Sequence, residues 1–436
     1  MSSRRTFLKD AALLGASSLI TPIAPARQEP RRQAAPLTPP SGSPGHVATD
    51  EAYWARVADQ YRVTPDMTNM EAGYFGMMAA PVLAAFHQHV DQVNQRSSYL
   101  ARREFPALGR SVRQGLADFL QVKPNEVAFS RNATEALQSL IGQYNGLRTG
   151  DTIVYADLDY NAMQYSMNAL AARTGARLVT FDVPEPASHA AVVAAYARVL
   201  EANPRTKLLL LTHCNNKTGL ILPVKEIVAL ARARGAHIVV DAAHSFGQVP
   251  LTIPELDADF VGLNLHKWIG APLGVGAMYI REDRLPLIDR AHGDPGPLEE
   301  IDSRLHTGTM NFAAILTVPD ALAFQAGIGI EYKAARLRYL RDRWVRAVRD
   351  VRGVDILTPD ESEMVGALTG FRLHGRGTGA ANRALSSALL DQFGIFTTAR
   401  TGLAKGDCVR VTPALYNSAG DADALAAAIT QLAARG

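Results

Sequence analysis

The chain has 436 residues, of which 47% are hydrophobic and 20% are charged, and its formal net charge is +3. This is the composition of a globular protein, and the length suits two or three domains or one large domain with a smaller one. A near-neutral charge without a large block of Lys and Arg argues against nucleic-acid binding. The two cysteines, Cys214 and Cys408, are too few and too distant for a disulfide framework, so we expect buried free thiols.

The first 26 residues are predicted to be an export signal. Residues 4–9, Arg-Arg-Thr-Phe-Leu-Lys, precede a short apolar run over 11–23 and an Ala-Pro-Ala segment at 24–26. Such a pattern forms a signal peptide, and the paired arginines resemble a twin-arginine signal for bacterial export in the folded state. A membrane anchor is disfavoured because the run is short and rich in Ser, Ala and Gly. We therefore expect recognition by the twin-arginine export machinery, cleavage after Ala26 and a periplasmic or otherwise exported protein.

Residues 27–50 are rich in proline and predict a linker. Strands and helices then alternate. The expected strands lie at 127–130, 152–155, 177–181, 207–212, 237–241 and 260–265, and the expected helices at 106–121, from 132 onward, and at 162–173, 189–202 and 224–234. Because these strands are continuously apolar, as parallel strands buried on both faces should be, the pattern predicts a doubly wound α/β fold with a mostly parallel sheet.

After about residue 330 the pattern changes. A charged helix over 331–351 leads into a unit with strands near 367–373, 394–399 and 408–412 and helices over 382–393 and 421–434. We therefore predict a large α/β domain over 51–330, including an N-terminal arm, and a small C-terminal α+β domain over 331–436.

Lys267 follows the apolar strand 260–265 directly, at the start of a Gly- and Pro-rich turn. Burial at such a position disfavours the ammonium form, which would provide an amine for Schiff-base chemistry. The alternative is a lysine that extends to the surface from a strand end. The neighbouring strand ends decide between the two.

In open α/β sheets, ligands bind beyond the carboxyl ends of the strands. Asn216 follows strand 207–212, and Asp241 and His244 follow strand 237–241. This set suits pyridoxal phosphate, whose aldehyde needs Lys267 and whose pyridinium nitrogen needs a carboxylate, here Asp241. Asn216 or His244 could contact its phenolic oxygen.

The phosphate of such a cofactor needs N–H groups at the start of a helix. The strand 127–130 ends at a helix whose first residues are Ala133 and Thr134, and both backbone N–H groups are expected to bind it.

Residues 241–244, Asp-Ala-Ala-His, are followed by Asn-Leu-His-Lys at 264–267 and by a Gly-rich segment at 274–279. This order resembles the fold-type I, aminotransferase class V family of pyridoxal-phosphate enzymes, and the likeness extends from residue 69 to residue 410. Within that family, the chain is most similar to the isopenicillin N epimerase-like branch. The resemblance implies a large cofactor-binding domain followed by a small C-terminal domain.

The resemblance also implies roles for individual residues. Asn216 would contact the phenolic oxygen with His244 beside it, and His266 would support the phosphate or the lysine. Asn264 stands where a serine commonly binds phosphate, which is a departure from the family pattern. Tyr160 would stack on the cofactor ring.

Two further implied roles concern substrate and subunit contacts. Arg410 would hold the substrate carboxylate, a task that suits a bidentate guanidinium. Thr309, within residues 306–311, resembles the segment that reaches the phosphate of a neighbouring subunit, which implies a homodimer with shared active sites.

Each of these residues also has a purely structural interpretation. Asp241 could cap a strand end, Asn216 could belong to a turn, Tyr160 could be core, and Arg410 could pair with Asp407. A metal site would require other side chains in combination, namely His213, Cys214, His244 and His266. These lack any recognised metal-ligand spacing.

The resemblance implies a reaction at Cα of an amino acid or peptidyl amine, with Lys267 as the general base. Transamination would return the proton through the same lysine, epimerisation would need an acid on the opposite side, for which Tyr160 is the candidate, and β-elimination would need a leaving group. Desulfurases of this family carry a nucleophilic cysteine on a loop upstream of the arginine that binds the substrate carboxylate. Cysteine desulfuration is therefore disfavoured, because the corresponding residues 394–405 contain no cysteine. The alternatives are an exported siderophore-tailoring transaminase-like enzyme, a C–S lyase, or an exported binding protein without catalysis.

Overall fold

The computed structural model describes residues 37, 40–305 and 308–435. The predicted export signal and the first part of the predicted linker lie outside these residues. The described chain contains a seven-stranded and a four-stranded sheet, each packed against helices, and a two-stranded sheet.

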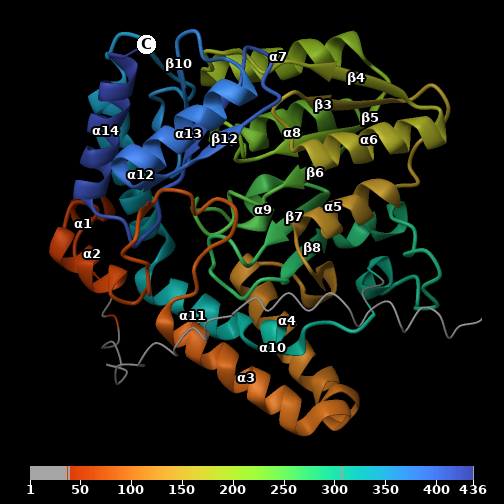
Figure 1. Cartoon of the computed structure of the whole chain (residues 1–436). Helices are drawn as coiled ribbons and strands as arrows, with labels where there is room; N and C mark the ends of the chain where they lie inside the picture. The colour runs from red at the N-terminus through yellow and green to blue at the C-terminus, as the bar shows by residue number, and fades with distance from the viewer. Residues whose placement is uncertain (1–36, 38–39, 306–307, 436) are drawn as a thin grey trace, which may run out of the picture. The chain divides into compact units, whose positions relative to one another are not determined.

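The larger sheet has seven strands (Figure 1). Their order is β2 (Val127–Ser130), β8 (Gly276–Ile280), β7 (Phe260–Asn264), β6 (His237–Asp241), β5 (Thr206–Thr212), β3 (Thr152–Ala156) and β4 (Arg177–Phe181). β8 runs antiparallel to both β2 and β7, and the other neighbouring pairs are parallel. The expected α/β fold with a mostly parallel sheet is confirmed.

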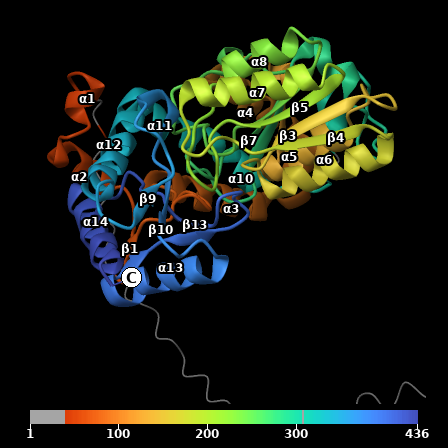
Figure 2. The same ribbon diagram turned by 90° about the horizontal axis from the view of Figure 1, so that it is seen from above.

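Helices cover both faces of this sheet, with α5 (Ala133–Gly142) and α6 (Asn161–Thr174) on one side and α7 (His189–Ala202) and α8 (Val224–Arg232) on the other (Figures 1 and 2). Alternate residues of β5 serve the two faces. Leu208 and Leu210 join the core formed with α5 and α6, whereas Leu209 and Leu211 join the core formed with α7 and α8. Burial on both faces explains why the strand is apolar throughout.

The smaller sheet is antiparallel, in the order β12 (Thr398–Arg400), β13 (Cys408–Val411), β10 (Thr369–Leu373) and β9 (Val354–Ile356). α12 (Ile330–Val348), α13 (Gly379–Phe393) and α14 (Ala419–Ala433) share one apolar core with it. The N-terminal part of the chain also reaches this region, because β1 (Thr68–Asn69) pairs in parallel with β11 (Ile395–Phe396).

The last part of the predicted linker is ordered. Residues Pro44–Val47 form α1, which is capped by Ser43 and contacts α12, and Val47 is buried. In the next helix, α2 (Glu51–Ala58), the Trp54 indole N–H donates to the Val47 carbonyl at 2.7 Å. Ordered structure therefore begins earlier than the proline content suggests, because one apolar residue and one indole anchor the segment.

The remaining helices include α3 (Ala80–Tyr99), α4 (Phe105–Leu120), α9 (Ile253–Leu256), α10 (Phe312–Leu316) and α11 (Val318–Ile328). The sequence pattern predicted α4 but not α3, α9, α10 or α11. Within the described ranges, no single helix is long and apolar enough to cross a membrane. One bent pair meets that test only when its members are taken together, namely residues 312–328 (α10 and α11) and α12, which meet at 73°.

Candidate active site

A cavity of about 320 Å³ lies beyond the carboxyl ends of β5, β6 and β7, beside the first turn of α5. Ten of the eleven predicted site residues line it: Ala133, Thr134, Tyr160, Asn216, Asp241, His244, Asn264, His266, Lys267 and Arg410. Thr309 is exposed and is not among the residues that line the cavity. The residues predicted from the strand ends and those implied by the family resemblance thus lie on one cavity.

Lys267 leaves the end of β7 with its amine 2.9 Å from Nε2 of His244. Burial lowers the pKa of Lys267, and the guanidinium of Arg410 acts in the same direction. The segment before α3 packs against the backbone of this strand end, where the Gly76 N–H donates to the His266 carbonyl at 2.8 Å. A Cβ at Gly76 would lie 1.9 Å from the Lys267 carbonyl oxygen, so only glycine fits there.

Asp241 ends β6, and its carboxylate accepts the Ala243 N–H at 2.9 Å. Burial raises the pKa of Asp241, the response expected of an acid removed from water. Burial also lowers the pKa of His244 well below its usual value, so its imidazole is neutral at physiological pH. A carboxylate and a neutral imidazole thus lie on the same cavity as the amine.

The buried polar atoms of cavity-lining residues that have no hydrogen-bond partner among the described residues include Oδ1 of Asn216 and Nδ1 of His244. Leaving such an atom unsatisfied costs about 1–3 kcal/mol, so their position on one cavity indicates a polar ligand. Pyridoxal phosphate fits this set, because its phenolic oxygen could bind between Asn216 and His244, and its ring nitrogen suits Asp241. Lys267 would bind its aldehyde.

The phosphate end of the predicted site differs in one respect. The Ala133 N–H donates to Oδ1 of Asn264 at 2.8 Å. This N–H was expected to bind the phosphate, but it is already bonded within the chain. The side chain of Asn264 instead ties the start of α5 to the end of β7. Thr134 also lines the cavity and is the remaining candidate to donate a hydrogen bond to the phosphate. The ring of His266 is fixed by the hydrogen bond from its Nδ1 to the Val275 carbonyl at 3.1 Å.

Arg410 of β13 is 1% exposed, and Glu71 pairs with it side-on. Its Nε donates to Oε2 of Glu71 at 3.2 Å and its Nη2 donates to Oε1, while its Nη1 donates to the Asn216 carbonyl at 2.8 Å. The sequence did not indicate this pairing, and Asp407 accepts from Gly402 instead. Arg400 of β12 also lines the cavity, but it was not predicted from the sequence. The only signal for it was its place on the strand that pairs with the strand of Arg410.

Tyr160 stands immediately before α6 and is 39% exposed while lining the cavity. It is therefore not a core side chain. Its place at the rim is compatible with contact to a bound ring or substrate.

Residues 79–425 match the family described as "Aminotransferase class-V". The chain belongs to this family. It is 31% identical over 401 residues to isopenicillin N epimerase of Streptomyces clavuligerus, an alignment that covers 87% of this chain and 98% of the relative. These findings confirm the expectation of a pyridoxal-phosphate-dependent enzyme of the class-V family.

Solved structures agree on the fold. The apo cysteine desulfurase from Thermococcus onnurineus NA1 aligns with a TM-score of 0.75 at 20% identity, covering 87% of this chain and 98% of that one. A C-DES variant with glycine covalently linked to its PLP cofactor aligns with a TM-score of 0.75 at 23% identity, covering 85% and 98%.

The cysteines of this class-V chain are free and buried, as expected. Burial raises the pKa of each thiol to about 12, and Sγ of Cys408 donates to the Lys217 carbonyl at 3.6 Å. Neither thiol is therefore placed to act as a nucleophile. Across residues 37, 40–305 and 308–435, no group of three or more His, Cys, Asp or Glu side chains is arranged to hold a metal ion.

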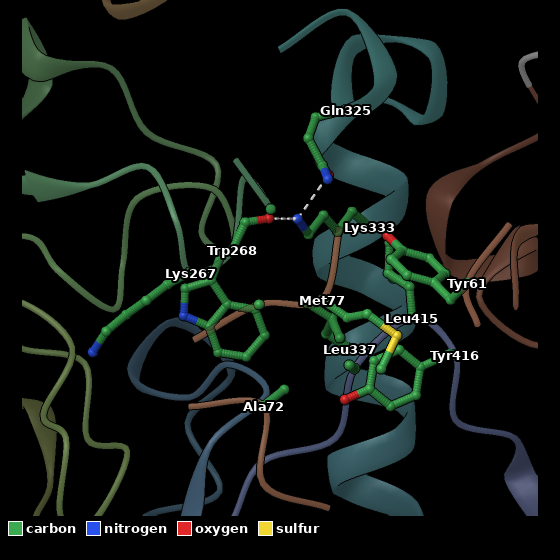
Figure 3. A pocket seen from close by; sticks show the side chains of 13 residues that line it. Tyr61, Ala72, Met77, Lys267, Trp268, Gln325, Lys333, Leu337, Leu415 and Tyr416 are labelled. Atoms are coloured by element: carbon green, nitrogen blue, oxygen red, sulfur yellow. Dashed lines mark hydrogen bonds between the residues drawn. The ribbon is translucent and has the colours of Figure 1, made fainter. Parts of the chain in front are cut away.

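A second, smaller cavity of about 30 Å³ is lined in part by the turn that follows β7, at Lys267, Trp268 and Gly270 (Figure 3). There Lys333, which is 3% exposed, donates to the Trp268 carbonyl and, at 2.7 Å, to Oε1 of Gln325. Nε2 of Gln325 in turn donates to the Ile269 carbonyl at 3.0 Å. Lys333 and Gln325 thus bind the carbonyls of the two residues after Lys267, whose amine points away from this group in Figure 3.

Replacing Lys333 tests this arrangement through pH. Burial lowers the pKa of Lys333 from 10.5 to about 7, so between these values the unfolded chain binds one more proton than the folded chain. Wild type should therefore gain stability relative to Lys333→Met as pH rises from about 7 to 10, by up to about 1.4 kcal/mol per pH unit. Denaturant unfolding of both proteins across this range measures the difference.

The matched control is Lys225→Met, at an exposed lysine of α8, which should show no such slope relative to wild type. A difference between wild type and Lys333→Met that stays constant with pH would contradict a neutral amine at this position.

Proposed function

We propose that this enzyme acts at Cα of an amino acid or peptidyl amine, as an aminotransferase or an epimerase similar to isopenicillin N epimerase. The observation that carries the proposal is the amine of Lys267, which lies 2.9 Å from Nε2 of His244 in a cavity that is also lined by Asp241, Arg400 and Arg410. When bound, pyridoxal phosphate withdraws electrons from a bond at Cα. The chain's own residues must then bind the substrate and move the proton.

Lys267 is the proton carrier in this proposal. Its lowered pKa makes the neutral amine available near neutral pH, and a base with a pKa close to the working pH is the most effective. Nε2 of His244 accepts a hydrogen bond from this amine and orients it. The carboxylate of Asp241 would stabilise positive charge on the ring nitrogen, and Arg400 and Arg410 place positive charge on the part of the cavity where a substrate carboxylate would bind.

The two reactions differ in how the proton returns. An aminotransferase can use Lys267 alone, whereas an epimerase needs a second acid, for which Tyr160 at the cavity rim is the candidate. The relationship to isopenicillin N epimerase across 98% of that relative supports epimerisation as the first activity to test, on amino acids and small peptides. The buried thiols speak against a desulfurase that uses its own cysteine.

The proposal predicts a holoenzyme with visible cofactor absorbance, which Lys267→Ala should alter, and activity at least about 10³-fold lower in that variant. The enzyme is incubated in deuterium oxide with a panel of amino acids and peptides. Deuterium at Cα with inverted configuration and without a keto acid identifies an epimerase, and a keto acid identifies an aminotransferase.

Tyr160→Phe separates the two reactions further. It should lower epimerisation about 10²-fold or more while Cα exchange through Lys267 persists. Purified protein without cofactor absorbance, or with absorbance that Lys267→Ala leaves unchanged, would refute the proposed function.

We also propose that two copies of the chain share their active sites. Tyr74 and Leu273 line the cavity yet are 73% and 55% exposed, and a second subunit seated at the cavity mouth would cover them. Thr309→Ala and Lys267→Ala should each be inactive, and mixed subunits should regain roughly a quarter of the activity because hybrids contain one intact site. Strictly monomeric active protein in sedimentation analysis would contradict shared sites.

Export remains a prediction from residues 1–26. In a bacterium with a twin-arginine pathway, the mature protein should appear outside the cytoplasm with Arg27 as its first residue. Changing Arg4 and Arg5 together to lysine should retain the uncleaved chain in the cytoplasm, as cell fractionation and N-terminal sequencing would show. Unaltered processing of that variant would contradict the predicted signal.

A further inference from the structure

We propose that Arg400 binds the substrate carboxylate, whereas Glu71 holds Arg410 as a supporting group and limits this part of the cavity to one carboxylate. The proposal rests on the proposed function, since it assigns the substrate class of the same site. It differs from the role that family resemblance implies for Arg410.

The guanidinium N–H groups of Arg410 already have hydrogen-bond partners within the chain. Nε and Nη2 face the two carboxylate oxygens of Glu71, and Nη1 is bonded to the Asn216 carbonyl. A guanidinium binds a carboxylate best through two parallel N–H groups, and this edge of Arg410 already has such a partner from the chain itself. Glu71 is 9% exposed, so solvent competes little for the pair.

The backbone also closes over Arg410. A Cβ built on Gly73 would lie 2.7 Å from Nη2 of Arg410, so the chain passes directly against the guanidinium. Next to Gly73, the backbone of residues 71–72 is fixed by a parallel bridge between Glu71 and Thr412 and by the hydrogen bond from the Ala72 N–H to the Thr412 carbonyl. Glu71 is therefore held beside Arg410 by backbone contacts as well as by charge.

Arg400 has the open fork. Its Nη2 makes only a long ion pair with Oε1 of Glu71, at 3.7 Å and beyond hydrogen-bond distance, and its buried Nε has no hydrogen-bond partner among the described residues. Thr398 pairs with Arg410 across β12 and β13, so Arg400, two residues on, projects from the same face of the sheet beside Arg410. Burial lowers the pKa of Arg400 to about 10, which still leaves it cationic at neutral pH.

The charges of these three side chains define the selectivity. Two guanidinium groups and one carboxylate give a net charge of +1, which one substrate carboxylate would neutralise. A ligand with two carboxylates would leave an excess negative charge in a partly buried site, which is costly. Removing the charge of Glu71 would raise the net charge to +2 and should favour the second carboxylate.

Methylamine, glycine and aminomalonate test this selectivity because they carry zero, one and two carboxylates on the same carbon. Their dissociation constants are measured on the holoenzyme through the change in cofactor absorbance. Arg400→Gln should reduce the preference for glycine over methylamine about tenfold or more, and Arg400→Lys should retain part of it. Glu71→Gln should increase the affinity for aminomalonate relative to the affinity for glycine by about tenfold.

The decisive variant is Glu71→Gln combined with Arg410→Gln. It leaves Arg400 in place and preserves the net charge of the group, so the preference for glycine over methylamine should stay within about threefold of wild type. Arg131→Gln serves as a control, because Arg131 also lines the cavity but pairs with Glu135, and it should not change the preference.

If the double variant loses the preference while Arg400→Gln keeps it, Arg410 is the carboxylate-binding residue and the proposal is wrong. A holoenzyme that responds to methylamine but shows no preference for glycine would likewise overturn it, with the proposed function intact. Protein without cofactor absorbance before any ligand is added would instead refute the proposed function.

Discussion

An amine held away from water imposes the main constraint on this site. Lys267 must stay close to neutral to act as a base or nucleophile, and the cavity achieves this by burial and by the nearby charge of Arg410. The same burial raises the pKa of Asp241, so the acid and the amine shift in opposite directions within one cavity. The strand-end geometry brings them together, and the contacts of Gly76 and Lys333 behind the turn keep the lysine backbone in place.

The sequence predicted much of this site for a physical reason. A parallel strand buried on both faces is apolar throughout, so its end is marked by the first polar residues, as at Asp241 and His266. Parallel neighbours then place these ends at one edge of the sheet. Seven of the ten predicted residues that line the cavity follow from this rule, whereas Tyr160, Asn264 and Arg410 were implied by the family resemblance.

Contacts between residues that are far apart in the sequence could not be predicted from the strand ends. Glu71 and Arg410 are 339 residues apart, and Asn264 binds the first N–H of a helix that begins 131 residues earlier. Nothing in the local pattern around Arg410 selects Glu71 over Asp407, because the partner depends on how the N-terminal segment docks beside β13. The same limit applies to β8, whose antiparallel position between β2 and β7 is a property of the whole sheet.

A lowered pKa does not by itself identify a reactive amine, as the two lysines of this region show. Lys333 is only 3% exposed, and its pKa is lowered to about 7. Its amine, however, donates to the Trp268 carbonyl and to Gln325 beside a space of about 30 Å³ that admits no substrate. Lys267 instead faces the large cavity beside an imidazole and a carboxylate. The surroundings of the amine, more than its titration, distinguish the structural lysine from the chemical one.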